Sequence, residues 1–336
     1  ALSALNDLVA WISRGGQIAI YDATNSTRDR RKLVRDKLLA NGFQVLFIES
    51  VCDDAAVIES NIRETKLSNP DYIGMDPADA VADFRKRIAH YKMAYQPLQP
   101  DQWSAIKIID VGRRIEVNRI RGFLMGRIVN FVMNLHITPR PIWLTRHGES
   151  TANAIGVIGG DTPLTPAGHQ YAHALQKFVG KRGKTSSVSV WTSTLQRTMQ
   201  TAAPMRVPTV QLRELDEIDA GICDGMTYSA IADQWPAEYE ARTRDKLRYR
   251  YPRGESYEDV IGRVEPLIIE LERQQDPVLV IAHQAVLRAL YGYFVGRTRE
   301  EVPHLDIPLH TVIELIPKAY ECDEQRHVLP PGADMT

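Results

Sequence analysis

The segment PIWLTRHGES, residues 141–150, decides how the second half of the chain is expected to fold. Apolar residues run directly into Arg146, His147, Gly148 and Glu149, which predicts a buried strand that stops at charged residues. A histidine at the end of a strand can serve as a metal ligand, a proton carrier or a nucleophile. Its partners elsewhere in the chain have to decide among these roles.

Composition limits the classes of protein to which the chain can belong. Its 336 residues are enough for two domains of ordinary size, and 44% hydrophobic with 25% charged residues is typical of a globular protein. No apolar run reaches the ~20 residues that cross a bilayer. The net charge of −1 gives no general attraction to nucleic acid or anionic lipid. We therefore expect neither a membrane nor nucleic acid as a partner, and we expect any anion binding to be local.

The chain ends and the cysteines give further expectations. Residues 1–16 predict an amphipathic helix and not a signal peptide, and the first residue is not Met, as in a fragment of a longer protein. Residues 325–336 predict a disordered tail. Cys52, Cys223 and Cys322 are far apart and form no CxxC, which favours reduced thiols in the cytoplasm over a disulfide framework or a zinc site.

Strand-like and helical segments alternate along the whole chain. A helix is expected at 28–40, and strands at 17–22, 44–50, 105–110, 141–145, 188–192, 277–282 and 311–316. Buried apolar runs separated by helices predict parallel sheets with right-handed crossovers. The proline-containing segment 135–141 predicts a boundary between two α/β domains, 1–138 and 139–336, each a mostly parallel sheet flanked by helices.

Residues with chemical potential follow the expected strand ends of the second half, where open α/β sheets bind ligands. His147 follows the first strand, a helix carrying Arg197 follows the second, and His283 follows the third. The acidic segment LRELDEIDAGICDG, residues 212–225, adds Glu217. We expect these histidines, arginines and the carboxylate to converge on one crevice.

The arginines decide between metal and phosphoryl chemistry. A zinc site uses His, Cys or carboxylate ligands and has no arginine beside the metal. A guanidinium fork suits phosphoryl oxygens, and Gly148 lets the backbone approach a bulky anion closely. The pattern favours His147 as a nucleophile in a metal-free site, kept neutral by adjacent arginines. Isolated histidines are expected to be packed or surface residues: His169, His173 and His310.

Longer motifs carry a resemblance to a known family. LTRHGES (144–150), SxxxRTxQTA (193–202) and VIAHQAVLR (280–288) resemble the histidine phosphatase, or phosphoglycerate mutase-like, superfamily. DEIDAGICDGMTY (216–228), RDKLRYRYPRGESYED (244–259) and PLHTVIEL (308–315) resemble more narrowly the bisphosphatase half of the 6-phosphofructo-2-kinase/fructose-2,6-bisphosphatase family. The resemblance covers residues from about 139 to 321.

The resemblance implies hydrolysis of the 2-phosphate of fructose 2,6-bisphosphate through phosphohistidine at His147, with Glu217 as proton donor. Arg146, Arg197 and His283 would bind the reacting phosphoryl group. The remaining implied contacts are Asn153 and Gly159 near that phosphate, and Tyr228, Arg242, Lys246, Tyr257, Gln284 and Arg288 around the sugar and its distal phosphate. A phosphoglycerate mutase-like or broad-specificity phosphatase, and a non-catalytic regulator that binds sugar phosphates, stay open as alternatives.

The basic stretch 242–253 holds six lysines and arginines opposed by Asp245 alone. By composition it could be an RNA-binding patch or a solvated face. Beside a phosphohistidine site, a clamp for a second substrate phosphate is the better interpretation.

The first half resembles the kinase half of the same family, through GGQIAIYDATNSTRDRRKLV (15–34), NIRETKLSNPDY (61–72) and DFRKRIAHYKMAYQPL (83–98). This implies a catalytic-region acid at Asp22, a nucleotide lining from Asn61 to Lys66, and fructose 6-phosphate contacts at Thr24, Arg30, Lys66, Arg87 and Tyr91. The 336 residues contain no GxxxxGK[ST], the loop that would hold the phosphates of Mg-ATP. We expect phosphatase but no kinase activity from this chain. A bifunctional parent protein and a homodimer are further implications.

Overall fold

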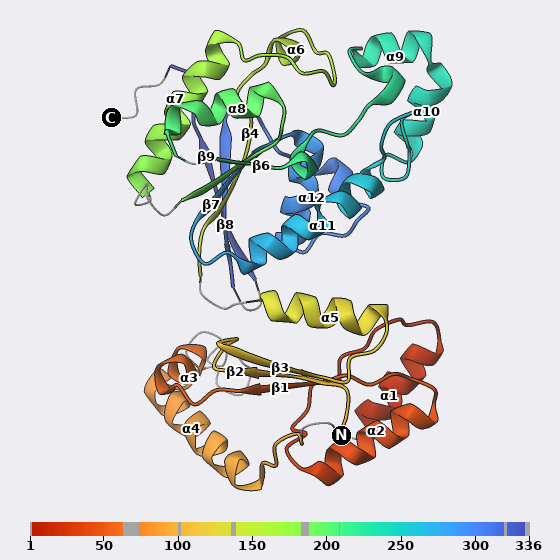
Figure 1. Ribbon diagram of the computed structural model, residues 1–336, viewed down its shortest axis with the longest axis vertical. Coiled ribbons are helices and arrows are strands. Elements are labelled where there is room, and N and C mark those ends of the chain that lie inside the picture. Colours follow the sequence, from red (N-terminus) through yellow and green to blue (C-terminus); the bar gives the residue numbers. More distant parts are fainter. Residues whose placement is uncertain are drawn as a thin grey trace. The chain divides into compact units, whose positions relative to one another are not determined.

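The computed structural model describes residues 2–62, 74–99, 102–135, 139–182, 188–207, 209–318 and 321–332. The chain divides into two compact units, Ala1–His136 and Ile137–Thr336, each built from α-helices around one β-sheet (Figure 1). Lys66 and part of the expected boundary segment lie outside the described residues. Within the described ranges, no helix is long and apolar enough to cross a membrane.

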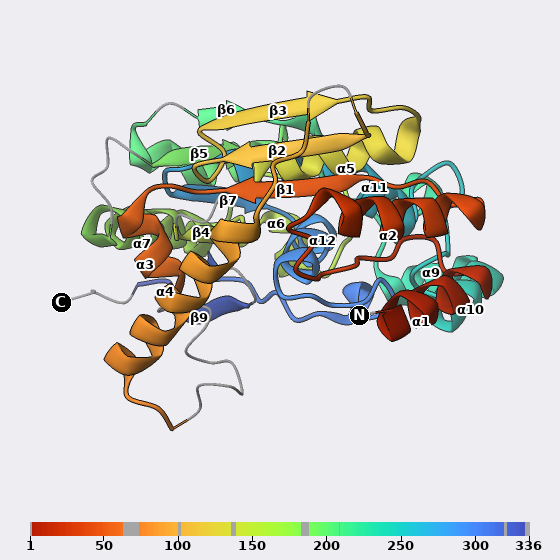
Figure 2. The same cartoon turned by 90° about the horizontal axis from the view of Figure 1, so that it is seen from below.

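The first unit has a three-stranded sheet in the order β1-β2-β3 (Figure 2). Its elements are α1 (Leu2–Ser13), α2 (Arg28–Ala40), β1 (Phe47–Val51), α3 (Ala55–Asn61), α4 (Pro77–Ala94), β2 (Ala105–Ile109), β3 (Arg114–Asn118) and α5 (Phe123–Asn134). β1 and β2 are parallel, whereas β3 is antiparallel to β2. Helices α2 and α4 lie on one face of the sheet and α5 on the other (Figure 1).

Helix α2 matches the predicted helix, and its start has a clear cause. The Thr27 hydroxyl accepts the N–H of Arg30 at 3.3 Å, which satisfies one of the free donors of the first turn. Val34 and Leu38 of α2 and Leu5 of α1 form a small buried core.

The expected strand at 17–22 is wrong, because this segment is irregular in the structure. Ile18 and Ile20, which would share one face of a strand, are 50% and 89% exposed. A strand needs a hydrogen-bonded neighbour, and the described sheet pairs β1 only with β2.

The second unit contains a six-stranded sheet in the order β6-β5-β7-β4-β8-β9. Its strands are β4 (Ile142–Arg146), β5 (Ser189–Thr192), β6 (Thr209–Gln211), β7 (Val278–Ala282), β8 (Thr311–Pro317) and β9 (Cys322–Val328). Its α-helices are α6 (Thr151–Ala154), α7 (Pro166–Arg182), α8 (Gln196–Ala202), α9 (Tyr228–Gln234), α10 (Pro236–Arg244), α11 (Tyr257–Arg273) and α12 (Gln284–Phe294).

Strands β5, β7 and β4 are parallel, as predicted, and β6, which the sequence did not predict, is parallel to β5. β8 departs from the prediction because it runs antiparallel to β4, and β9 pairs antiparallel with β8. Only four residues, 318–321, separate β8 from β9, which is too few for the helical crossover that a parallel pair requires. The predicted disordered tail is therefore wrong for residues 325–328, which belong to β9.

Strand β7 explains why the sheet is buried on both faces. All five of its residues are buried, and they alternate between two cores. Val278, Val280 and Ala282 pack in the core that contains α11 and α12, whereas Leu279 and Ile281 pack in the core that contains α7. A continuous apolar run is what a central parallel strand covered on both faces requires.

Candidate active site

The two strand-end histidines meet at the carboxyl edge of the second sheet. β4 and β7 are parallel with Arg146 opposite Ala282, so His147 and His283 each follow directly after a strand. The His147 N–H donates to the Ala282 carbonyl at 3.1 Å. The imidazole centroids are 5.0 Å apart, and the residues are 3% and 0% exposed. The predicted convergence of the histidines is present.

Arg197, in the first turn of α8, joins the two imidazoles. Its Nε–H faces Nε2 of His147 at 3.2 Å and Nδ1 of His283 at 3.3 Å. Its Nη1 donates to the Gly160 carbonyl at 2.6 Å. Because a guanidinium only donates, both facing imidazole nitrogens act as acceptors and carry no proton.

The hydrogen bond of the other nitrogen in each imidazole ring completes the assignment of the tautomers. Nδ1 of His147 then carries the proton and donates to the Gly148 carbonyl at 2.7 Å. Nε2 of His283 donates to Oγ of Ser193 at 2.8 Å. Nε2 of His147 is therefore the nitrogen with a lone pair directed into the site.

Burial keeps both histidines neutral. It lowers the pKa of His147 to about 3, and the charge of Arg197 adds to the effect. The pKa of His283 is also well below its usual value, again chiefly through burial and then through Arg197. The predicted direction is confirmed, but burial and not the arginines is the larger cause.

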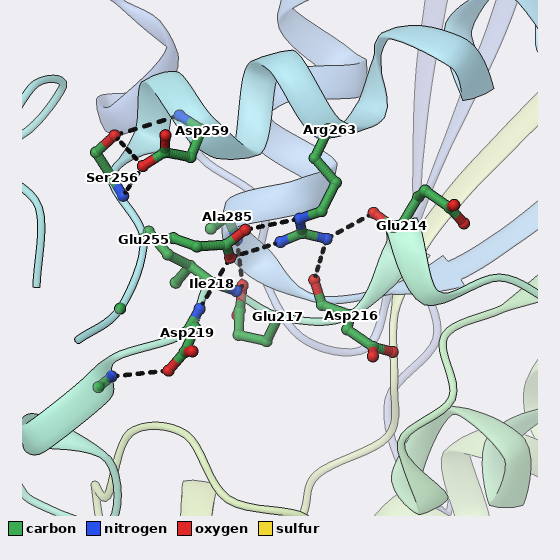
Figure 3. Close-up of polar contacts among 12 residues, drawn as sticks. Glu214, Asp216, Glu217, Ile218, Asp219, Glu255, Ser256, Asp259, Arg263 and Ala285 are labelled. Atoms are coloured by element: carbon green, nitrogen blue, oxygen red, sulfur yellow. Dashed lines mark hydrogen bonds and ion pairs between the residues drawn. The ribbon is translucent and has the colours of Figure 1, made fainter.

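Glu217 reaches the site from the segment between β6 and α9 (Figure 3). His283, the residue before α12, supplies no side-chain cap, and Glu217 takes that position instead. Its Oε2 accepts the N–H of Gln284 and its Oε1 the N–H of Ala285, both at 3.1 Å. When it is ionised, Glu217 raises the pKa of Arg146 and Arg197 against the larger lowering by burial, so it lies within electrostatic reach of both.

Arg146 ends β4 with its side chain largely enclosed. Nη1 donates to the Ile307 carbonyl at 3.4 Å. Within the described ranges, its Nε–H is buried and has no acceptor. A buried guanidinium with a spare donor suits an anionic ligand.

A second basic cluster forms around Arg242 on α10. Its Nε donates to the Tyr251 hydroxyl at 2.8 Å and its Nη2 to the Tyr228 hydroxyl at 2.9 Å. The guanidinium also lies over the Tyr228 ring, 4.5 Å from its centroid. Two phenols thus fix its orientation.

Lys246 and Arg288 extend this cluster. Nζ of Lys246 donates to the Pro303 carbonyl at 2.7 Å and lies 5.7 Å from the ring centroid of Tyr257. Arg288 donates to the Tyr257 hydroxyl at 2.9 Å. Burial, followed by the charges of Arg288 and Arg242, lowers the pKa of Lys246 to about 8. Three cations within electrostatic reach of one another produce a local positive potential that favours a multiply charged anion.

The rest of the basic stretch serves another purpose. Arg248 pairs with Asp245 at 3.4 Å and Glu300 at 3.3 Å, and Arg250 pairs with Asp259 at 2.5 Å. These are exposed ion pairs, so only part of the stretch contributes to the cluster.

Asn153 and Gly159 lie in the connection between β4 and α7. Asn153 forms a capping box with Ser150 at the start of α6. Gly159 has φ +75°, and an added Cβ would lie 1.5 Å from Oδ1 of Asp224, so a side chain there would strain the backbone and displace Asp224. The same Oδ1 accepts the N–H of Gly160 at 2.9 Å, and Gly160 is the residue whose carbonyl receives Arg197.

Gly148 brings two backbone segments into contact. A Cβ on Gly148 would lie 2.5 Å from the carbonyl oxygen of Gly168 in α7, and a Cβ on Gly168 would lie 2.2 Å from the Glu149 carbonyl oxygen. The Gly148 N–H donates to the Thr201 hydroxyl at 2.9 Å. The turn after β4 is thereby fixed to both α7 and α8.

Sequence reasoning missed Ser193, the partner of His283, although it stands at a strand end in the quoted motif. His310 also proves to be closer to the site than expected. It packs on Tyr171 with centroids 5.0 Å apart, and a charge on it would lower the pKa of His147.

Within the described ranges, no group of three or more His, Cys, Asp or Glu side chains could hold a metal ion.

The kinase-type candidates of the first unit come from separate elements. Asp22 and Thr24 lie in the loop before α2, Arg30 on α2, and Arg87 and Tyr91 one turn apart on α4. Arg30 donates to the Tyr21 hydroxyl at 2.7 Å. The chain after α4 reaches this loop, because the Gln96 N–H donates to the Ser26 carbonyl at 2.9 Å. Asn61 is the last residue of α3.

Two strand-end imidazoles around one arginine, at the carboxyl edge of an α/β sheet, agree with the histidine phosphatase class. The family description "Histidine phosphatase superfamily (branch 1)" matches residues 142–329. The alpha-ribazole phosphatase of Shigella flexneri has the same fold, with a TM-score of 0.51 and 24% identity over 58% of this chain and 99% of that one.

The first unit matches a second family, described as 6-phosphofructo-2-kinase, over residues 1–139. The two matches together narrow the family to which the chain can belong. The Gallus gallus 6-phosphofructo-2-kinase/fructose-2,6-bisphosphatase is 51% identical over 96% of this chain and 69% of that protein. The Homo sapiens 6-phosphofructo-2-kinase/fructose-2,6-bisphosphatase 3 is 51% identical over 96% of this chain and 62% of that protein. The chain belongs to the 6-phosphofructo-2-kinase/fructose-2,6-bisphosphatase family.

Proposed function

We propose that the second unit hydrolyses the 2-phosphate of fructose 2,6-bisphosphate to fructose 6-phosphate and inorganic phosphate. The observation that carries the proposal is the Arg197 bridge between two buried, neutral imidazoles. It leaves Nε2 of His147 unprotonated and next to a guanidinium, which is what attack on a phosphoryl group needs.

In the first step, Nε2 of His147 forms a bond to phosphorus while the bond from phosphorus to the C2 oxygen breaks. Glu217 gives its proton to that oxygen, and fructose 6-phosphate leaves. Arg146 and Arg197, with His283, stabilise the charge on the phosphoryl oxygens. In the second step, Glu217 takes a proton from water, whose oxygen attacks phosphorus and breaks its bond to His147.

The cluster of Arg242, Lys246 and Arg288 supports a substrate with a second phosphate. We propose that it binds the 6-phosphate while Tyr228 and Tyr257 contact the sugar. Helix α12 connects the two ends of the site, because Gln284 in its first turn contacts Glu217 and Arg288 one turn later contacts Tyr257.

A phosphoglycerate mutase-like or broad-specificity phosphatase is the competing function. Turnover of fructose 2,6-bisphosphate is compared with that of 3-phosphoglycerate in the presence of 2,3-bisphosphoglycerate. We expect a kcat/KM at least ~10²-fold higher for the sugar bisphosphate, because several charged hydrogen bonds depend on its second phosphate. Equal turnover would replace the proposal with the competing function. Binding without turnover would favour a regulator.

For the first unit we propose fructose 6-phosphate binding by Thr24, Arg30, Lys66, Arg87 and Tyr91, with Asp22 near the reacting groups and Asn61 near the nucleotide. Mg-ATP would be the cofactor of the parent protein, and a cytoplasmic homodimer its state. No GxxxxGK[ST] occurs in the 336 residues, so we expect ADP production at background in a coupled assay of this chain. Synthesis of fructose 2,6-bisphosphate by the purified chain would contradict this.

A further inference from the structure

Glu217 lies on a segment with little regular structure, between the 3₁₀ turns Arg213–Leu215 and Gly221–Cys223. The carboxyl group accepts two N–H groups at the start of α12, and its position also depends on how firmly the backbone on both sides is held. Figure 3 shows that the side chains of Arg263 of α11 and of Glu255 lie against this segment.

Arg263 holds the backbone before Glu217. Its Nη1 donates to the carbonyl oxygens of Glu214 at 2.7 Å and Asp216 at 3.0 Å. Its Nε and Nη2 donate to the two carboxylate oxygens of Glu255, both at 2.9 Å. Only a planar guanidinium offers these two forks at once, and an ammonium group cannot reproduce them.

Glu255 holds the backbone after Glu217. Its Oε2 accepts the Asp219 N–H at 3.1 Å, and its own N–H donates to the Asp219 carbonyl at 2.9 Å. A Cβ on the neighbouring Gly254 would lie 2.3 Å from that carbonyl oxygen, so the two backbones are in direct contact. The Arg263 and Glu255 side chains are 21% and 24% exposed, which leaves their pairing less screened than that of the surface arginines.

We propose that Arg263 and Glu255 are positioning residues for the proton donor: they act on the phosphoryl step by holding Glu217 and do not touch the substrate. The proposal rests on the proposed role of Glu217. Arg263→Lys keeps the charge but loses both forks. Since a misplacement of ~1 Å at a reacting group can cost ~10²-fold, we expect kcat to fall by ~10–100-fold with KM for fructose 2,6-bisphosphate within about twofold.

A mutant cycle tests whether Arg263 acts through Glu217. R263K should cost little once Glu217→Gln has removed the donor, so the two effects should not multiply. R273K on the same helix is the matched control, because Arg273 forms an exposed pair with Glu270. Wild-type kcat in R263K, or a full additional loss in E217Q/R263K, would overturn the proposal.

A substrate that needs no proton donor separates positioning from general damage. p-Nitrophenolate leaves without protonation, so the rate of phosphoenzyme formation from p-nitrophenyl phosphate should change less than about threefold in R263K and E255Q. An equal loss with p-nitrophenyl phosphate and with fructose 2,6-bisphosphate, at unchanged thermal unfolding, would overturn the proposal.

An error in the proposed substrate would give a different result from an error in the positioning role. The unaltered chain would then form phosphohistidine from p-nitrophenyl phosphate and leave fructose 2,6-bisphosphate intact. The cycle would be measured with a simple alkyl phosphate, whose leaving oxygen also requires a proton, and the same two outcomes would decide the positioning role.

Discussion

The two ends of the proposed substrate site are built differently. At the phosphoryl end, His147, His283 and Arg197 are at least 96% buried, and Arg197 hydrogen-bonds to both imidazoles. At the distal end, Arg242 and Lys246 are held by tyrosine rings and a backbone carbonyl, and Tyr228 is 41% exposed. Enclosed groups that cannot reorganise suit a chemical step, whereas more accessible cations suit recognition. Substitutions should therefore affect kcat at one end and KM at the other.

The largest effect is expected at the phosphoryl end from His147→Ala. Loss of the attacking nitrogen should reduce turnover by more than ~10⁴-fold. Incubation with substrate labelled in the 2-phosphate, followed by an alkaline quench, should label the unaltered chain and not the variant. His173→Ala, an exposed histidine of α7, is the control. Label retained in His147→Ala would place the nucleophile elsewhere.

The next effect concerns proton transfer. Glu217→Gln keeps an oxygen that can accept from the start of α12, so substrate binding should persist while kcat falls by ~10²–10⁴-fold. Steady-state kinetics with a direct binding measurement separates the two quantities. A kcat near that of the unaltered chain would assign the proton to another group, with Glu149 the next candidate.

At the distal end the expected effect moves from kcat to KM. Arg242→Ala and Lys246→Met each remove a charged hydrogen bond to the second phosphate, so KM should rise by ~10–100-fold with kcat nearly unchanged. Arg250→Ala, from the same basic stretch but in a surface pair with Asp259, should change neither. A fall in kcat at constant KM would move these cations to the reacting phosphate and erase the difference between the ends.

The smallest effect depends on pH. Because the pKa of Lys246 is about 8, the side chain loses its charge in the free enzyme as pH rises through that value. KM should therefore increase by a few fold between pH 7 and 9, and Lys246→Arg, which stays charged, should flatten the curve. His147, with a pKa of about 3, stays neutral over this whole range and adds no change of its own. A KM that rises equally in both proteins would assign the titration to another group.

The sequence predicted the strand-end residues well because position along a parallel sheet depends on local patterns. An apolar run followed by His147 or His283 places each imidazole at the same edge whatever the helices between them do. The same reasoning failed for residues 17–22, where strand formation depends on a neighbour and not on the segment itself.

Contacts between distant side chains could not be predicted either, because they also depend on neighbours that the local sequence does not show. The basic stretch reads alike at Arg242 and Arg250, yet one lies among tyrosines and the other pairs with Asp259. The direction of each arginine side chain depends on where α10 ends and on the path of the chain after it. The bond from Ser193 to His283 likewise joins residues 90 positions apart.

The contact between Gly148 and Gly168 limits how far this site can be redesigned. In most packed pairs a larger residue on one side can be offset by a smaller one on the other. Here both partners already have the smallest side chain, and the atoms they meet are backbone oxygens that no substitution can trim. A library that varies Gly148 and Gly168 should therefore return glycine at both positions, while Ile155, which is 70% exposed, should accept many residues.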